Sequence, residues 1–317
     1  MSIEATTRPR IRWTDYVVYI GFAAIFLFFA ATLHDRGFLS FYNMMTIIRQ
    51  TTPIAIMAVG MTFAMSTGQI DLSIGAVVAL AALVTAIVLR EVGIFPALLA
   101  GLAVGVLVGT VNGLLTVTLR IPSLLVTLGT LGIVAGLARS ITNLESVPIV
   151  DDTYVFIFGS GNIGPISVLM IWTFAILVIG HVFLRNTRFG SHILATGGDP
   201  DSASAVGIGT ARMKIYAFVI CSVTAALAGM LYAGRLHGAR YTLGEADLLT
   251  VIAAVVIGGT SLFGGKGSVV GSVIGSWVMG MLNNGLILMG FTVAEQMMAR
   301  GVILIMAVAL SLREIKE

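Results

Sequence analysis

The sequence predicts an all-α, polytopic membrane protein, and three observations lead to this fold class. Hydrophobic residues make up 57% of the 317-residue chain and charged residues 10%, whereas soluble domains carry about 25% charged residues. The mean hydropathy is +1.02. Apolar runs close to the ~20 residues that a bilayer requires recur along the whole chain. An ordinary soluble globular protein is therefore excluded.

Charge and cysteine content narrow the function classes further. The formal net charge is +3, and Lys and Arg lie in loops between apolar runs instead of forming a basic patch. We therefore expect no nucleic-acid partner. The single cysteine, Cys221, excludes an internal disulfide and a cysteine metal cluster. The four histidines are far apart in the sequence, so no metal site is expected.

The first element is a basic N-terminal tail, residues 1–15, followed by an apolar run at 16–33. Arg8, Arg10 and Arg12 ahead of this run resemble the start of a signal peptide. The run is nearly long enough to span a bilayer and lacks a small-residue cleavage site. We therefore predict a retained first helix with a cytoplasmic N-terminal tail.

The transmembrane domain is predicted at residues 16–312 and contains about ten spans. Their ranges are 16–33, 47–66, 70–89, 94–118, 122–141, 165–184, 214–234, 248–264, 269–289 and 294–312. Residues 313–317 form a short C-terminal tail. An even number of spans predicts this tail on the cytoplasmic side, together with the N-terminus.

The distribution of Lys and Arg supports this topology. Eleven of these residues fall on the predicted cytoplasmic side and four outside, which agrees with the positive-inside rule. The remaining three, Arg49, Arg139 and Arg300, fall within spans or at their ends. A charge at the bilayer centre costs ~2.5–3.5 kcal/mol on insertion scales. These side chains are therefore expected to pair, to snorkel or to face the bundle interior.

The largest predicted external loop, residues 142–164, is acidic. It contains Glu145, Asp151 and Asp152 and no Lys or Arg. Such a periplasmic loop could dock a soluble partner through complementary charge. It could equally be a solvated loop.

Small residues recur at helical spacing inside the spans. Gly101, Gly105 and Gly109 lie on one helix face, and a second set of the same spacing begins at Gly267. This pattern lets helix backbones approach closely. It predicts a tight bundle and carries no information about cargo.

The segment GQIDLSIG, residues 68–75, is the most informative polar motif between spans. Asp71 or Ser73 could cap the following helix, whose free N–H groups lipid cannot satisfy. Helix starts inside a bundle are also where transporters pass polar solutes. Both readings stay open, and both can hold together.

A related pattern recurs later in the chain. Gly68-Gln-Ile-Asp71-Leu72 is followed by Asn112-Gly113-Leu114, and Gly244-Glu-Ala-Asp247-Leu248 is followed by Asn284-Gly285-Leu286. The two copies are offset by five spans, so the second copy would be inverted in the membrane. This predicts a five-plus-five inverted repeat, a common transporter plan. The predicted translocation-path residues are Gln69, Asp71, Ser73, Asn112 and Asn284.

The longest polar interruption runs from Arg185 to Lys214, and the positive-inside rule predicts residues 185–213 as a cytoplasmic loop. Its interior is rich in Ala and Gly, and Asp199-Pro200 breaks helical geometry because the residue before proline avoids the α region. The loop could be a contact surface for another protein. A plain connector is the alternative.

The chain is not expected to hydrolyse ATP. A phosphate-binding loop needs G-x-x-x-x-G-K-[ST], and the nearest segment, which begins at Gly259, has Gly265 where Lys is required. A tight turn with Lys266 on the cytoplasmic side explains this segment better. No convergent acid, base and nucleophile set appears either. We therefore predict a protein that is not an enzyme and needs no cofactor.

Four motifs in order along the chain resemble a known family. They are TGQIDLSIGAV at 67–77, NGLLTVTLRIPSLLVTLGT at 112–130, TRFGSHILATGGDPDSASAVGI at 187–208 and IGGTSLFGGKGSVVGSVIGS at 257–276. Together they resemble the ribose/xylose/galactose-type permeases of bacterial ABC importers, within the branched-chain amino acid and sugar permease superfamily. The resemblance covers nearly the whole chain.

The resemblance implies a ten-helix permease for a sugar or similar polar solute in the bacterial inner membrane. Its implied partners are a second permease copy, two cytoplasmic ATPase subunits and a periplasmic solute-binding protein. The loop at 187–208 would be the coupling segment that docks on the ATPase. The positions in this segment that match the family motif are Gly190, Ala195, Gly197, Gly198, Ala203, Gly207 and Ile208. Asp199 joins them as a candidate coupling residue.

Three positions depart from the family pattern. Asp199 stands where Asn is usual, Ser191 where Arg is common and Ser202 in place of an Ala. The family's positive charge is missing at Ser191, and this difference is expected to alter the fit between the loop and its partner ATPase.

The alternative function is a secondary transporter or channel driven by an ion gradient, for which Asp71 and Glu295 are the candidate intramembrane carboxylates.

Overall fold

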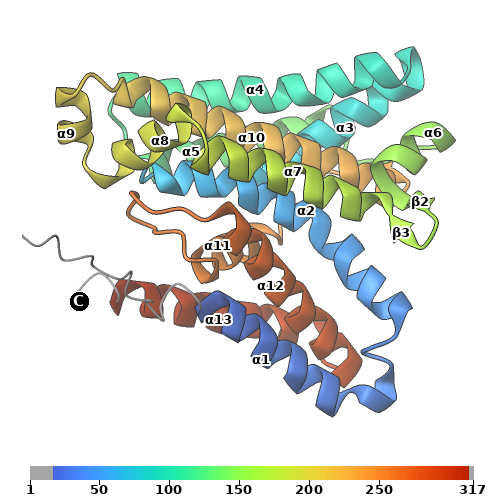
Figure 1. Ribbon diagram of the computed structural model, residues 1–317. Helices are drawn as coiled ribbons and strands as arrows, with labels where there is room; N and C mark the ends of the chain where they lie inside the picture. Colours follow the sequence, from blue (N-terminus) through green and yellow to red (C-terminus); the bar gives the residue numbers. More distant parts are fainter. Residues whose placement is uncertain (1–16, 314–317) are drawn as a thin grey trace, which may run out of the picture.

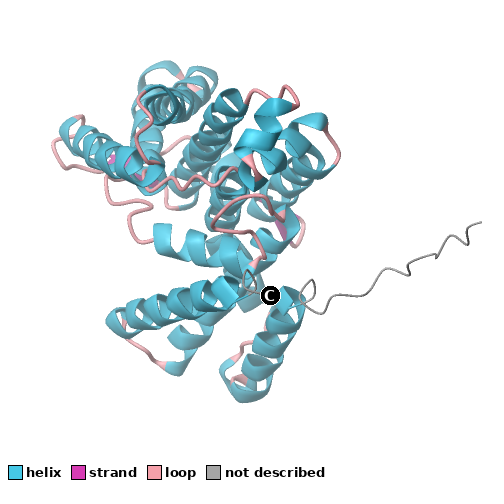
Figure 2. Cartoon of the chain, turned by 90° about the vertical axis from the view of Figure 1, so that its left-hand side faces the viewer, coloured by secondary structure: helices cyan, strands magenta, loops and turns pink. Residues whose placement is uncertain are grey.

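The computed structural model describes residues 17–313 (Figure 1). The predicted N-terminal tail, with Arg8, Arg10 and Arg12, and residues 314–317 of the predicted C-terminal tail lie outside the described residues. Helices make up most of the described chain, and strands are confined to short segments (Figure 2). An all-α membrane protein, as predicted, is therefore confirmed at the level of fold class.

The long helices follow the predicted apolar spans in order. They are α1 (Val17–Thr32), α2 (Phe41–Ser66), α3 (Ile74–Val92), α4 (Ile94–Thr118), α5 (Ser123–Ser140), α7 (Val168–Arg185), α10 (Thr210–Arg235), α11 (Leu248–Ile257), α12 (Val269–Met289) and α13 (Val293–Arg313). Among the described residues, seven of these helices are long and apolar enough to cross a membrane: α2, α3, α4, α5, α7, α10 and α12.

The short elements lie at the two ends of the bundle. One end carries α8 (Arg188–Gly198) and α9 (Pro200–Ala205), and the opposite end carries α6 (Asp152–Val155), β2 (Asn162–Ile163) and β3 (Ile166–Ser167) (Figure 1). The remaining short segments are η2 (His34–Arg36), β1 (Val147–Pro148), the π-helical turn η3 (Phe156–Ser160) and β4 (Gly238–Ala239). β1 pairs with β4 and β2 with β3, both antiparallel.

Helix α10 forms the centre of the bundle and packs against α2, α3 and α4. The glycine stripe of α4 explains the close approach. A Cβ added at Gly105 would lie 2.6 Å from the Ser222 carbonyl oxygen, and one at Gly109 would lie 2.7 Å from the Phe218 carbonyl oxygen. The predicted packing role of this stripe is confirmed, because any larger side chain would push α4 off α10.

Helix α11 is shorter than the predicted span at 248–264. It ends at Ile257, and Gly259 adopts the left-handed conformation with φ of +84°. Thr260 and Ser268 then close a turn, in which the Ser268 N–H donates to Thr260 Oγ1 at 3.2 Å. Gly259 therefore stops the helix early, and the apolar composition of the following residues did not reveal this.

The predicted external loop at 142–164 is folded onto the bundle. Asp151 caps α6 by accepting from the Tyr154 N–H at 2.7 Å, and the buried Tyr154 hydroxyl donates to the Met230 carbonyl oxygen at 3.0 Å. A large part of the loop is thus structural. Its predicted acidic residues Glu145 and Asp152 stay exposed.

The three arginines within spans all make polar contacts. Arg49 Nη2 donates to Asn162 Oδ1 at 2.7 Å, and Arg139 Nη2 donates to Glu245 Oε1 at 2.6 Å. Arg300 Nε donates to the Gln296 carbonyl oxygen at 3.4 Å. Arg139 is therefore paired with a carboxylate, whereas Arg49 and Arg300 are hydrogen-bonded to neutral groups.

Candidate translocation site

The candidate site lies where the chain breaks between α2 and α3. Helix α2 ends at Ser66, and Gly68 reverses the chain with φ of +74°. The Gly68 and Gln69 N–H groups donate to the Met65 and Ala64 carbonyl oxygens at 2.9 and 3.1 Å. This C-terminal cap satisfies the last carbonyls of α2 and sends residues 69–73 into the bundle.

Asp71 is the centre of a buried polar cluster in this break. Its Oδ1 accepts from the Ser73 N–H at 2.8 Å and from the Ser73 hydroxyl at 2.6 Å, and its Oδ2 accepts from the Ser222 hydroxyl at 3.2 Å. Asn112 donates from Nδ2 to Ser73 Oγ at 3.0 Å and lies 3.5 Å from both carboxylate oxygens. All four residues are fully shielded from solvent.

The cluster favours a structural role for Asp71 in the conformation described. Its carboxylate accepts the Ser73 N–H at the start of α3, whereas the Ser73 side chain makes no capping bond of its own. Asn112 Oδ1 is buried and has no hydrogen-bond partner among the described residues. The cluster is closed to solvent in this conformation.

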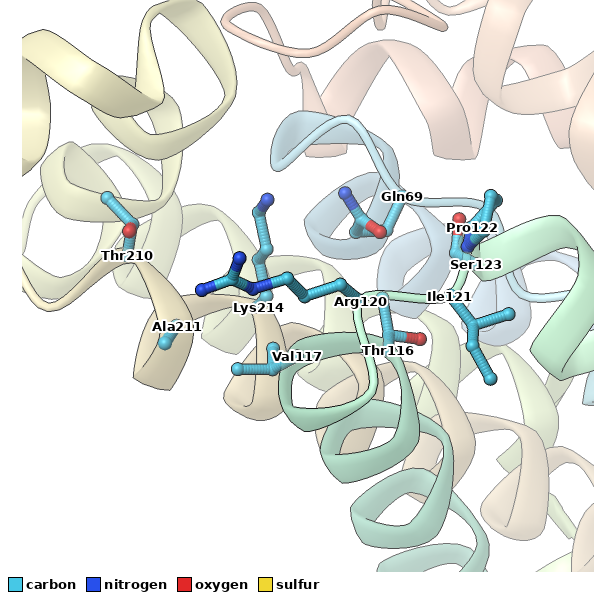
Figure 3. Close-up of a pocket in the computed structure, with 10 residues that line it drawn as sticks. All are labelled: Gln69, Thr116, Val117, Arg120, Ile121, Pro122, Ser123, Thr210, Ala211 and Lys214. Atoms are coloured by element: carbon cyan, nitrogen blue, oxygen red, sulfur yellow. The ribbon is translucent and has the colours of Figure 1, made fainter.

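Gln69, next to the cluster in sequence, lies in an open pocket of about 370 Å³. The pocket is bounded by the α4–α5 connection and the first turn of α10, with Arg120 and Lys214 on one side (Figure 3). Ser123 joins the two regions, because its hydroxyl accepts from the Ile70 N–H at 3.4 Å. The predicted path residues Gln69 and Asp71 therefore lie close together: Gln69 lines the open pocket, and Asp71 lies in the buried cluster beside it.

Asn284 lies apart from this site. It forms a reciprocal amide pair with Asn43, in which each Nδ2 donates to the other Oδ1 at 2.9 and 3.0 Å. Asp247, the carboxylate of the predicted second copy, instead accepts from the Tyr232 hydroxyl at 2.7 Å. The structure brings Asp71, Ser73 and Asn112 together and leaves Asn284 in a separate contact.

The two segments of the predicted repeat nevertheless meet inside the bundle. Gly244 has a left-handed φ of +80°, as Gly68 does with +74°. A Cβ at Gly75 would lie 2.6 Å from the Gly244 carbonyl oxygen, and one at Gly244 would lie 2.8 Å from that of Gly75. The start of α3 and the loop before α11 are thus in backbone contact.

The predicted coupling loop is a pair of short helices, α8 and α9. Thr187 caps α8 by accepting from the Gly190 N–H at 3.2 Å. Asp199 caps α9 by accepting from the Asp201 and Ser202 N–H groups, both at 3.1 Å. The Ser202 hydroxyl also donates to Asp199 at 2.5 Å, and this bond lowers the pKa of the Asp199 carboxyl below its ordinary value. Pro200 fits the first helical position because its missing N–H needs no partner there.

The small residues of this loop have different structural roles. Gly190 and Ala203 are buried, and a Cβ at Gly190 would overlap the Leu184 carbonyl oxygen. Gly207 has φ of +87° and ends α9, with the Ile208 N–H donating to the Ala203 carbonyl oxygen at 3.0 Å. These positions shape the loop itself, while Ala195 is half-buried and Asp199 is exposed.

Gly197 packs within the chain at a three-way junction. A Cβ at Gly197 would overlap the Ser66 carbonyl oxygen, and a Cβ at Gly264 would lie 2.5 Å from the Gly197 carbonyl oxygen. The Gly265 N–H donates to the Ser66 carbonyl oxygen at 3.1 Å. The small residues at 197 and 198 therefore permit close contact with α2 and the α11–α12 loop. The exposed residues nearby, Gly198 and the 77% exposed Val206, remain open to a partner.

Sequence reasoning missed several of these contacts. Ser222, which completes the Asp71 cluster, is one small polar residue in an apolar helix, and nothing in its spacing marks it. Arg120 and Lys214 were interpreted only as markers of the cytoplasmic side, and their shared pocket depends on the packing of α4 against α10. Asp247 was recognised as part of the repeat, but its contact with Tyr232 was not anticipated.

Comparisons with known proteins identify relatives over most of the chain. Residues 43–308 match the family model described as "Branched-chain amino acid transport system / permease component". The ribose import permease protein RbsC of Escherichia coli strain K12 is 38% identical over 276 residues, which cover 86% of each chain. RbsC of Bacillus subtilis strain 168 is 35% identical over 309 residues, 96% of each chain. The L-arabinose transport system permease protein AraH of Escherichia coli strain K12 is 34% identical over 93% of this chain and 90% of its own. No solved structure matches the chain. The resemblance stated from the motifs is confirmed.

Proposed function

Because the chain belongs to the family of permease components of branched-chain amino acid transport systems, we propose that it is the membrane-spanning subunit of an ABC importer. The proposed cargo is a sugar or a similar small polar solute, because the relatives named above are permeases for ribose and L-arabinose. ATP hydrolysis is assigned to separate cytoplasmic subunits. The solute is delivered by a periplasmic binding protein.

One observation carries this proposal: the coupling loop is joined by direct backbone contact to the helix that leads into the Asp71 cluster. Gly197 of α8 packs on the Ser66 carbonyl oxygen, the last residue of α2. Five residues further on, Asp71 binds the start of α3 and Ser222 of α10. A displacement of α8 by an ATPase would therefore move the C-terminal end of α2 and strain the cluster.

The proposed topology has ten membrane-embedded helices with both termini in the cytoplasm of a bacterial inner membrane. Seven helices meet the length and apolarity expected of a span, and α1, α11 and α13 follow the remaining predicted spans. The inverted repeat is supported by α2 and α10, which have 26 residues each, and by the left-handed glycines that come before Asp71 and Asp247.

A second permease copy is proposed to pack along α5. Gly129, Gly132 and Gly136 on this helix have no atom within 4 Å of an added Cβ, apart from their own helix. Ile133 in the same stretch is 66% exposed. Small residues on an uncovered membrane helix allow a second helix to approach closely. Homo- and heterodimers are both compatible with this face.

The proposed path runs past Asp71, Ser73, Asn112 and Gln69 towards the pocket beside Arg120. Asn284, paired with Asn43, is proposed to act at another level of the bundle. The alternative, a gradient-driven carrier, is less well supported, because Glu295 is engaged in a capping box. Its Oε2 accepts from the Thr292 N–H at 2.6 Å and from the Thr292 hydroxyl at 2.8 Å.

Co-purification and reconstitution test the proposal. A tagged permease should retain an ATPase subunit during purification, and proteoliposomes holding both should take up a pentose or hexose only with ATP and binding protein present. Uptake by the permease alone under a proton or sodium gradient would contradict the proposal and support the carrier.

A further inference from the structure

The charged side chains that line the pocket beside Gln69 are all positive. Arg120 and Lys214 both line it, and no carboxylate does. Figure 3 shows the charged ends of Arg120 and Lys214 turned to the same space, opposite Gln69. Neither side chain has an acidic partner among the described residues. Two like charges that share a pocket repel each other, so an anion between them would be attracted by both.

Two helix starts strengthen this field. Ser123 begins α5 and Thr210 begins α10, and both residues line the pocket. Their N-cap residues are Pro122 and Gly209, which have no side chain that could accept the first-turn N–H groups. Helix N-termini carry partial positive charge and bind phosphate and carboxylate groups. The helix starts and the two cations therefore act on the same volume.

The neutral polar groups suit an oxygen-rich anion. Ser123, Thr210 and Gln69 bring hydroxyl and amide donors to the wall. A phosphate group, which offers several acceptor oxygens, would use more of these donors than a single carboxylate would.

The surface beside the pocket is apolar and exposed. Leu119 is 60% exposed, and Val111 and Leu114 on the preceding turns of α4 are 46% and 44% exposed. Leu119 precedes the pocket residue Arg120 in the sequence, and Val111 and Leu114 lie on the last turns of α4. Basic pockets between helices on the cytoplasmic side of membrane proteins bind lipid head groups. These exposed apolar side chains would contact the acyl chains of such a lipid.

We propose that the pocket of Arg120, Lys214, Ser123 and Thr210 binds a phosphate group, supplied by an anionic phospholipid head group or by free phosphate. Arg120 and Lys214 supply charge, and the first turns of α5 and α10 supply N–H donors. The inference concerns a ligand other than the cargo and does not depend on which solute is transported. It gives Arg120 and Lys214 a role beyond orienting the chain in the membrane.

The test uses the purified full-length permease in nanodiscs and measures its thermal unfolding midpoint. One arm compares phosphatidylcholine with phosphatidylcholine containing phosphatidylglycerol, without phosphate. The other arm titrates inorganic phosphate in phosphatidylcholine alone, at constant ionic strength with chloride as the balancing ion. We expect at least one arm to raise the midpoint of the wild-type protein. The lipid arm alone identifies a head group, and the phosphate arm identifies the free ion.

Variants tie the effect to the pocket. Arg120→Gln and Lys214→Gln should each weaken apparent binding by roughly tenfold, which corresponds to about 1.4 kcal/mol. Arg212→Gln is the matched control, because Arg212 lies on the same helix turn as Lys214 but does not line the pocket. Lys214→Arg, which keeps the charge, should restore binding and guards against a folding defect in Lys214→Gln.

Three results would overturn the inference. The first is that neither arm changes the midpoint of the wild-type protein. The second is that Arg212→Gln loses the effect as fully as the pocket variants do. The third is that the pocket variants respond normally to lipid and phosphate but fail to retain the ATPase subunit, which would assign the cations to an acidic protein surface. None of these measurements involves solute uptake, so failure here leaves the proposed transport function standing.

Discussion

Replacing Asp71 by leucine separates the two roles considered for this carboxylate. In the structure Asp71 accepts from the Ser73 N–H, the Ser73 hydroxyl and the Ser222 hydroxyl. Leucine has a similar size and accepts no hydrogen bond. Ser222 lies inside α10, so its hydroxyl can turn to a backbone carbonyl of that helix, as serines in helices commonly do. The Ser73 hydroxyl keeps its bond with the Asn112 amide. The Ser73 N–H is fixed by the backbone and cannot reorient, so it is left buried without an acceptor.

The expected cost follows from that one group. A buried donor left unsatisfied destabilises a protein by about 1–3 kcal/mol. We therefore expect Asp71→Leu to lower the thermal unfolding midpoint by several degrees and still to insert into the membrane. Asp71→Asn should cost less, because its amide oxygen can still accept the Ser73 N–H. Asp35→Leu is the control, since the side chain of Asp35 is fully exposed.

Uptake then decides the pathway role. Proteoliposomes that contain the permease variant, the ATPase subunit and the binding protein are loaded with ATP, and uptake of labelled sugar is measured at matched protein levels. If Asp71 lies on the path, the Asp71→Leu protein should lose most uptake even at a temperature where that protein is fully folded. Wild-type uptake by Asp71→Leu under those conditions would refute the path role and leave Asp71 as a structural cap.

The remaining predictions concern coupling and topology. Gly197→Ala should destabilise the protein by about 1–3 kcal/mol through overpacking against the Ser66 carbonyl and reduce solute-stimulated ATPase activity; wild-type activity and unfolding midpoint would contradict the three-way junction. Val206→Glu should weaken retention of the ATPase subunit in pull-downs while the unfolding midpoint stays unchanged, and undiminished retention would exclude Val206 from the contact. In a chain lacking Cys221, a cysteine at Ser160 should react with an impermeant thiol reagent from outside, and one at Ser202 only after the membrane is opened; the reverse pattern would invert the topology.

The sequence was sufficient for the order of the helices and for several local features. Apolar runs predicted the helices because each run must satisfy its backbone internally in lipid. Asp199-Pro200 predicted the break between α8 and α9, since proline restricts the preceding residue and fits the first helical position. The Asn that is usual in the family at position 199 can accept the same N–H bonds as Asp199, so this departure leaves the cap intact.

The sequence was not sufficient for contacts between distant segments. Asp71 and Ser222 are 151 positions apart, and only the packing of α10 beside the α2–α3 break brings them together. Gly197 was interpreted as a docking position because small residues permit close approach. The structure satisfies that approach within the chain, against Ser66 and Gly264. A small residue in the sequence indicates that another segment packs closely against it, but the sequence does not show which segment that is.

That distinction changes how the coupling loop is expected to work. If Gly197 met the ATPase directly, substitutions there would weaken subunit docking and leave the permease fold intact. Because Gly197 packs instead on the end of α2, we expect such substitutions to disturb the link between a docked ATPase and the Asp71 cluster. The docking surface should then be the exposed face around Asp199 and Val206. Docking and transmission would thus depend on different faces of the same two helices.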